Sequence, residues 1–108
     1  MLPKKNRLTV KEFQEAFRNG KRFHGVYTTI IYMPHTSYKA AVVVSKKVTT
    51  KKPVRNTLRR RYYTLFAQQV LQTQKITGTY IISVKKNALH ASYGMLAASL
   101  QKTLAHIQ

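Results

Sequence analysis

The sequence predicts a small α+β domain, a sheet with helices packed on it, whose elements follow the order α-β-β-α-β-α. Apolar residues recur at three- and four-residue steps over residues 10–19, 53–72 and 93–107, which is the period of an amphipathic helix. β-Branched and aromatic residues gather over residues 26–33, 39–44 and 79–84, as they do in strands. The 108 residues, 44% of them hydrophobic, suit one compact domain with a modest core. A single domain is therefore expected over residues 1–108.

The ends of the first helix are marked by capping residues. Thr9 is followed three residues later by Glu12, which is the spacing of a capping box, and Gly20 stands where helices commonly end. A carboxylate in the first turn also suits the positive end of a helix. Phe13 and Phe17, four residues apart, share one face of this helix. Their spacing is typical of core residues and fits a binding surface as well.

The first two strands, residues 26–33 and 39–44, flank a turn at residues 34–37, which predicts that they form a hairpin. The second is an almost continuous apolar run, as is typical of a central strand with both faces partly covered. The third strand, residues 79–84, follows the helix over residues 53–72. If the second and third strands are parallel neighbours, a right-handed crossover between them is the default.

The segment from Lys46 to Arg61 carries eight of the twenty lysine and arginine residues and no acid. From Pro53 onward the segment is predicted to be a helix, because proline is tolerated in a first turn and apolar residues then follow at helical spacing. Arginine forks match phosphate oxygens in geometry and always stay charged. The expected apolar face holds Leu58, Tyr62, Leu65, Phe66 and Val70, and the opposite side holds mainly Arg55, Asn56, Arg59 and Arg60.

A last helix is expected after a loop over residues 72–78, the third strand and a polar connection over residues 85–91. Ser92 supplies its N-cap. The apolar face of this helix holds Leu96, Leu100, Leu104 and Ile107.

The charge of the chain indicates a polyanionic partner. Twenty lysine and arginine residues stand against two acids, Glu12 and Glu15, which gives a net charge of +18. Such a domain repels itself, so counterions or a partner must relieve the repulsion. Nucleic acid fits this folded pattern better than an anionic membrane, which favours single amphipathic helices. No apolar run reaches the ~18–20 residues that span a bilayer. Residues 1–7 lack the apolar stretch of a secretory signal, so a soluble cytoplasmic protein is expected.

The composition argues against catalysis by the protein itself. The chain has no Asp and no Cys, which excludes a Ser-His-Asp triad and thiolate metal sites, and we assign no catalytic or metal-binding residue. The two carboxylates lie three residues apart in one helical segment, where a capping role is the simpler interpretation. The four histidines, His24, His35, His90 and His106, show no ligand spacing.

Aromatic rings beside basic residues suit single-stranded nucleic acid, because bases stack on the rings for ~1–3 kcal/mol each while cations hold the backbone. The candidate rings are Phe13, Phe17 and Tyr27. Phosphate contacts made by the basic segment would not specify a nucleotide sequence. The residues themselves therefore predict binding of RNA or DNA through residues 46–61.

Residues 45–48 read SKKV and residues 55–60 read RNTLRR. In this order, the two motifs resemble the signature of the bacterial ribonuclease P protein subunit. Residues 45–48, SKKV, are similar to its Ser-Lys-Lys element at the end of a strand, and residues 55–60, RNTLRR, to its Arg-Asn-Arg-x-Lys-Arg helix. Residues 6–23 and 93–100 are similar as well, so the resemblance covers essentially the whole chain. The chain departs from the family pattern at Thr57, in place of the second arginine of the triplet, and at Thr49, where glycine is common. A third departure is Tyr63, near a frequent further arginine.

The resemblance implies a part in a ribonucleoprotein endonuclease that removes the 5′ leader from precursor tRNA. In that family the RNA subunit holds the catalytic Mg²⁺ ions and performs the hydrolysis, while the protein is a non-catalytic component, here expected to be monomeric and 1:1 with the RNA. The resemblance also implies a left-handed crossover around the basic helix in place of the right-handed default. It assigns contact with the RNA subunit to Lys46, Lys47, Lys52, Arg55, Asn56, Arg59 and Arg60, and contact with the leader to Phe13, Phe17 and Tyr27.

Three alternatives remain beside this interpretation. A structural RNA-binding protein of the ribosomal type would bind RNA with the same helix and have no role in tRNA processing. A DNA-binding regulator would place that helix in a major groove, but no second helix lies a short turn before it. A protein-only nuclease conflicts with the count of two acids.

Overall fold

A computed structural model describes residues 4–73 and 77–107 and contains every predicted helix and strand, with small shifts at their ends. It adds a four-residue strand after the first helix, so the order is α-β-β-β-α-β-α. Residues 74–76 of the expected loop lie outside the described residues. The elements are η1 (Lys4–Asn6), α1 (Val10–Asn19), β1 (Lys21–His24), β2 (Thr28–Met33), β3 (Tyr38–Val43), α2 (Lys52–Thr73), β4 (Gly78–Val84), η2 (Lys86–His90) and α3 (Tyr93–Ile107).

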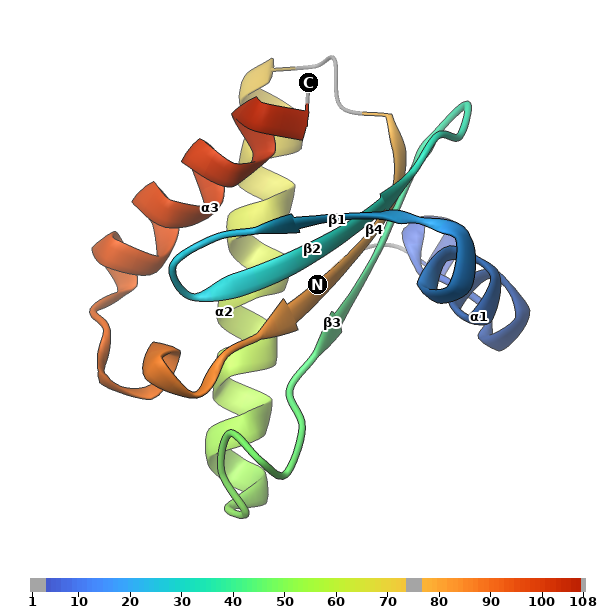
Figure 1. Cartoon of the computed structure of the whole chain (residues 1–108). Helices are drawn as coiled ribbons and strands as arrows, with labels where there is room; N and C mark the ends of the chain where they lie inside the picture. Colours follow the sequence, from blue (N-terminus) through green and yellow to red (C-terminus); the bar gives the residue numbers. More distant parts are fainter. Residues whose placement is uncertain (1–3, 74–76, 108) are drawn as a thin grey trace.

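The four strands form one mixed sheet in the order β1-β2-β4-β3 (Figure 1). β4 pairs antiparallel with β2 and parallel with β3. The predicted hairpin between residues 26–33 and 39–44 is therefore wrong, because β4 lies between those strands. The central position expected for residues 39–44 is wrong for the same reason. β4 is the strand whose residues are nearly all buried, and placing it in the middle covers both of its faces.

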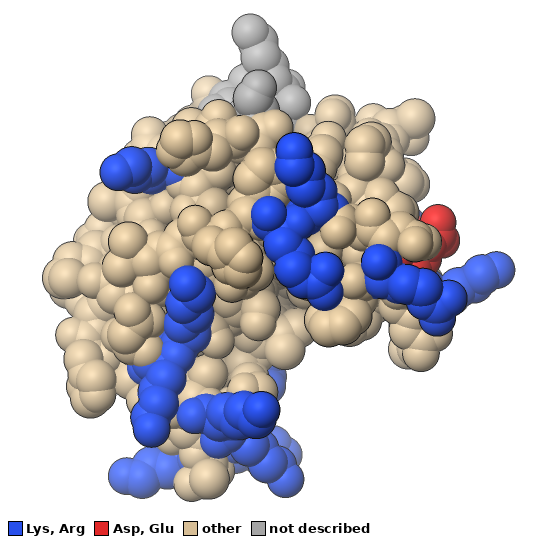
Figure 2. Space-filling model, viewed as in Figure 1, with Lys and Arg blue, Asp and Glu red and all other residues tan. Residues whose placement is uncertain are grey.

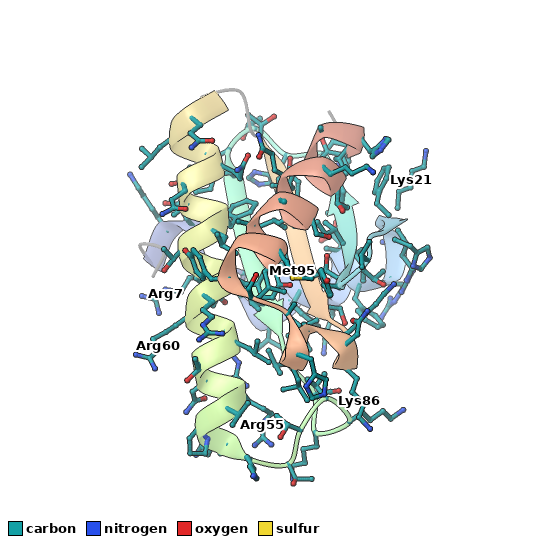
Figure 3. The ribbon with its side chains drawn as sticks, turned by 90° about the vertical axis from the view of Figure 1, so that its left-hand side faces the viewer. Arg7, Lys21, Arg55, Arg60, Lys86 and Met95 are labelled. Carbon is teal, nitrogen blue, oxygen red and sulfur yellow. The ribbon has the colours of Figure 1, made fainter. Side chains whose placement is uncertain are left out.

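The connection from β3 through α2 to β4 is left-handed, as the family resemblance implied and against the right-handed default. Both strands run in the same direction, and α2 lies on the face of the sheet that it shares with α3 (Figures 1 and 3). Seen from that face with the strands pointing upward, β4 lies to the left of β3.

Alternating residues of the strands build two hydrophobic cores on the two faces of the sheet. On one face, Ile30 and Ile82 pack with α2 and α3. The predicted apolar faces of both helices pack there too, and only Val70 and Ile107 at their ends are partly exposed. On the other face, Ile31 and Ile81 pack with Ala16 of α1. The result is three layers, with α2 and α3 on one side of the sheet and α1 on the other (Figure 1).

Gly20 ends α1 for a reason that differs from the usual left-handed cap. Its φ is −73°, which any residue can adopt, and its N–H donates to the carbonyl oxygen of Ala16 over 2.7 Å. A Cβ at this position would lie 2.5 Å from the oxygen of Ala16 and 2.6 Å from Cγ2 of Ile31. Glycine is therefore required because the chain turns closely against the sheet as it enters β1.

Candidate nucleic-acid interface

The basic segment forms the loop after β3 and the first turns of α2. Val48 is buried and anchors the loop, while Lys46 and Lys47 are exposed on a turn closed by the Val48 N–H, which donates to the Ser45 oxygen over 3.1 Å. Lys52 is exposed in the first turn of α2. Basic side chains gather at the end of the molecule where α2 begins (Figure 2). Three of the predicted cations thus lie in solvent at one end of the helix.

Two arginines of this segment, Arg55 and Arg59, are positioned by hydrogen bonds. Arg55 is partly buried and donates from Nη1 to the carbonyl oxygen of Thr49 over 3.0 Å, which ties the helix to the preceding loop (Figure 3). Arg59 donates from Nη1 to Oδ1 of Asn56 over 2.7 Å. Arg60 projects from α2 into solvent (Figure 3). The Asn56 side chain therefore orients the guanidinium of Arg59, and Arg55 uses one of its donors to hold the loop.

A small hollow of about 190 Å³ lies on the side of α2 that faces β3, lined by Asn56, Arg59, Arg60 and Tyr63. The Tyr63 hydroxyl accepts a hydrogen bond from the N–H of Val42 over 3.2 Å. That bond satisfies a backbone donor of the edge strand and holds the ring beside the arginines. We define the basic surface as the seven residues predicted to bind the RNA subunit, Lys46, Lys47, Lys52, Arg55, Asn56, Arg59 and Arg60.

The two acids of the chain lie away from the basic surface. Both are in α1, on the opposite face of the sheet from α2. Glu12 completes the predicted capping box with Thr9 and also pairs with Lys39 of β3. Hydrogen bonds from Lys39 and from the Thr9 backbone lower the pKa of Glu12 to about 2. Among the described residues, neither carboxylate side chain therefore offsets the charge of the basic surface.

The predicted leader-binding rings of α1 stack on each other. The rings of Phe13 and Phe17 have centroids 6.0 Å apart and an interplanar angle of 17°. Phe17 is 50% exposed, whereas Phe13 packs against the smaller core. Arg22 of β1 covers the Phe17 ring at 5.2 Å from its centroid and donates to the Phe17 oxygen over 3.2 Å. These three residues, which we call the ring platform, line a hollow of about 510 Å³ with Gln14 and Arg18.

The structure does not bring Tyr27 to the ring platform. Tyr27 lies just before β2 and packs, partly buried, against the larger core under α2 and α3. Burial raises the pKa of Tyr62 in that core, and the nearby Tyr27 raises it further. If Tyr27 belonged to the strand, the alternation of side chains would put it on the α1 face of the sheet. β2 begins only at Thr28, so the position of Tyr27 does not follow that alternation. Tyr27 thus packs, partly buried, against the larger core and not beside Phe13 and Phe17.

Sequence reasoning missed two residues of these surfaces, Arg22 and Tyr63. Arg22 lies in β1, which was not predicted because Phe23 is its only apolar residue. The register pairs Arg22 with Ile31, so a predicted strand at residues 21–24 would have placed Arg22 on the α1 face. Tyr63 was noted only as a departure from the family pattern. Its role depends on the hydrogen bond to β3, for which the sequence carries no local signal.

Within residues 4–73 and 77–107, no three His, Asp or Glu side chains gather where they could hold a metal ion. None of the helices in these same ranges is both long and apolar enough to cross a membrane.

Residues 2–108 match the sequence model of the family Ribonuclease P. The chain belongs to the ribonuclease P protein family. Curated relatives agree. The ribonuclease P protein component of Pseudanabaena sp. is 32% identical over 97% of this chain and 93% of its own length. That of Picosynechococcus sp. is 34% identical over 95% of this chain and 90% of its own.

Solved structures of ribonuclease P proteins share the fold. The protein from Staphylococcus aureus superposes with a TM-score of 0.83 at 17% identity, covering 95% of each chain. The protein from Thermotoga maritima gives 0.82 at 19% identity, covering 94% of this chain and 97% of its own. Membership in the ribonuclease P protein family implies an RNA partner and a part in the nuclease complex. The relatives named above are ribonuclease P proteins, not ribosomal proteins.

Proposed function

We propose that this protein assists a catalytic RNA in removing the 5′ leader of precursor tRNA, binding the RNA subunit with its basic surface and the single-stranded leader with its ring platform. The observation that carries the proposal is the placement of these two surfaces on opposite faces of one sheet, on α2 and on α1 (Figure 1). One folded domain can therefore contact two RNA strands at once. The proposal takes one protein molecule to act with one RNA molecule, in the cytoplasm.

The basic surface suits a structured RNA because it is rich in charged donors and two of its arginines, Arg55 and Arg59, are held in place by hydrogen bonds. Arg59 is oriented by Asn56, so little side-chain freedom is lost when the guanidinium meets a phosphate. The lysines of the loop are exposed and add charge without fixed geometry. Such contacts bind phosphates independently of base identity. The surface is thus expected to recognise the shape of the RNA subunit.

The ring platform suits a leader whose sequence varies. Every base has a π face, so stacking on the half-exposed Phe17 tolerates any nucleotide. Arg22 lies over part of that ring and can reach a leader phosphate, so a base would stack on the part of the ring that Phe13 and Arg22 leave exposed. Phe13 supports the stack from the core side. A leader would be held by stacking and charge together, and a mature tRNA end would lack those contacts.

In this proposal the hydrolysis belongs to the RNA. Mg²⁺ ions bound by RNA phosphates would activate the attacking water and stabilise the leaving oxygen. The chain has no Asp, and one of its two carboxylates caps α1 and pairs with Lys39. What the protein supplies is positive charge between two polyanions, which lowers the concentration of Mg²⁺ that their association needs.

The test is cleavage of a 5′-extended precursor tRNA by the ribonuclease P RNA of the same organism at low Mg²⁺, with and without the protein. We expect strong stimulation, a mature 5′ end and no cleavage by the protein alone. Absence of stimulation by a protein shown to be folded by circular dichroism would refute the proposal. Light scattering of the assembled particle reports its stoichiometry.

A further inference from the structure

The solvent side of α2 carries a second hollow, on the flank opposite to the hollow beside Tyr63. This α3-side hollow has a volume of about 340 Å³. Arg60 contributes to both hollows, whereas Arg59 and Arg61 each contribute to one. That division follows from helix geometry, because residues two apart point about 200° away from each other. The α3-side hollow is lined by Thr57, Arg60, Arg61, Thr64 and Tyr93.

The α3-side hollow combines a ring with guanidinium groups. Tyr93 is the first residue of α3 and is 41% exposed, although it is a large aromatic residue beside a packed helix pair. Arg60 and Arg61 are exposed. Thr57 turns its hydroxyl inward, donating to the carbonyl oxygen of Pro53 over 3.0 Å, and lies one turn before Arg61 on the same flank. The hollow thus offers a stacking face and at least two phosphate donors.

The charged residues that line the α3-side hollow are both arginines. Both acids of the chain belong to α1, on the far face of the sheet. Within residues 4–73 and 77–107, no side-chain carboxylate therefore competes for Arg60 and Arg61, and the half-exposed ring of Tyr93 can accept a planar partner. An aromatic ring beside uncompensated arginines is the combination that binds a nucleotide of an unpaired RNA segment, with its base on the ring and its phosphate on the guanidinium.

We propose that the α3-side hollow binds an unpaired nucleotide of the RNA subunit, with the base stacked on Tyr93 and the phosphate held by Arg61. The RNA interface then extends from α2 across to α3, and Arg60 bridges the two flanks. The inference rests on the proposed function, since it concerns the same RNA. It adds Arg61 and Tyr93 to the basic surface, which otherwise lies on the loop after β3 and on α2.

The experiment measures the dissociation constant of the full-length protein for the ribonuclease P RNA as a function of salt. Tyr93→Ala is expected to weaken binding about 5- to 150-fold, the loss of one stacked base, with an unchanged salt slope. Tyr93→Phe keeps the ring and should bind like the wild type. The slope of log affinity against log salt is negative, and Arg61→Ala should reduce its magnitude by about 0.7–0.9, the loss of one phosphate contact.

Matched controls separate binding from folding. Met95→Ala removes another exposed apolar side chain from the start of α3, outside the hollow, and should leave binding unchanged (Figure 3). Lys102→Ala removes one exposed charge from the later turns of α3 and should change the slope less than Arg61→Ala. Wild-type binding by folded Tyr93→Ala, or an unchanged slope for Arg61→Ala, would overturn the inference. If Tyr93→Ala does not fold, the slope of Arg61→Ala decides alone.

The outcomes also separate this inference from the function on which it rests. If the wild-type protein stimulates leader removal while Tyr93→Ala and Arg61→Ala bind the RNA as it does, only the α3-side hollow is refuted. If the wild-type protein neither binds the RNA nor stimulates cleavage, both proposals fail.

Discussion

The ammonium of Lys39 on β3 lies 2.5 Å from the Oε2 carboxylate oxygen of Glu12 in α1. The other oxygen of the same carboxylate, Oε1, accepts the backbone N–H of Thr9 over 2.9 Å. One side chain therefore caps the helix and ties it to the edge strand of the sheet. Because α1 carries the ring platform, this ion pair also helps to fix where the platform stands relative to the sheet.

The stability that Glu12 provides is expected to depend on pH. Its pKa is lowered from 4.5 to about 2 in the folded protein, chiefly by the hydrogen bond from Lys39. A depressed pKa means that the carboxylate stabilises the fold above about pH 4.5 and that this contribution is lost as the pH falls towards 2. Glu12→Gln should therefore lower the free energy of unfolding at pH 7, and its difference from the wild type should shrink below pH 4.5.

Urea unfolding at fixed ionic strength from pH 7 down to pH 2.5 measures this difference. Gln can keep the capping hydrogen bond, so the comparison isolates the charge. Glu15→Gln is the matched control, because it removes the same charge from the same helix while Glu15 is exposed and makes no ion pair within the described residues. A difference for Glu12→Gln that stays constant over the whole pH range would contradict the linkage.

The salt dependence of RNA binding should report how many phosphates the basic surface binds. Replacing Arg59 and Arg60 together by Ala should weaken binding to the RNA subunit and flatten its salt slope by about 0.7–0.9 for each phosphate that the variant no longer neutralises. The control Lys11→Ala/Lys102→Ala removes two exposed charges from α1 and α3. An unchanged slope in the arginine variant would remove this part of α2 from the interface.

Elements encoded by neighbouring residues could be predicted from the sequence. The capping box of Thr9 and Glu12, the buried face of α2 with Tyr62 and Phe66, and the Ser92 cap of α3 each depend on residues within a few positions of one another. These local signals agree with the fold, and a helical period continued over many residues is hard to misread.

Relationships between distant segments could not be predicted in the same way. Which strands pair depends on how much apolar surface the whole sheet buries. Nothing within residues 39–44 shows that β4 lies between β2 and β3. Tyr27 changes faces because β2 begins after it, a shift of one residue. Arg22 and Tyr93 join their sites only through the placement of β1 on β2 and of α3 on α2. The left-handed connection from β3 to β4 was predicted only from the family resemblance, because the spacing of apolar residues carries no information on handedness.

The close turn at Gly20 should make that position intolerant of any side chain. Gly20→Ala puts a Cβ 2.5 Å from the oxygen of Ala16, so the helix end or Ile31 must shift, at a cost of about 1–3 kcal/mol. Gly94→Ala is the matched control, because a Cβ there meets nothing within 4 Å and alanine favours helix by up to about 1 kcal/mol. The midpoint temperature of thermal unfolding should therefore fall for Gly20→Ala and stay or rise for Gly94→Ala. Equal shifts of the two variants would show that the backbone at Gly20 accommodates a Cβ without strain.

The two rings of the platform should separate leader binding from folding. Phe17 is 50% exposed, so Phe17→Ala is expected to leave stability nearly unchanged and to reduce the preference for precursor over leaderless tRNA about 5- to 150-fold, the loss of one stacked base. Phe13 packs with Ile31 and Ile81, so Phe13→Ala should destabilise the fold by a few kcal/mol, about 3–5 at full burial. Binding of both tRNA forms to the assembled holoenzyme, beside urea unfolding of the free protein, measures both effects.

Phe17→Tyr keeps a stacking ring and should keep the preference. If folded Phe17→Ala still prefers the precursor as the wild type does, the leader does not stack on this ring, and the hollow beside Arg22 must be assigned another role.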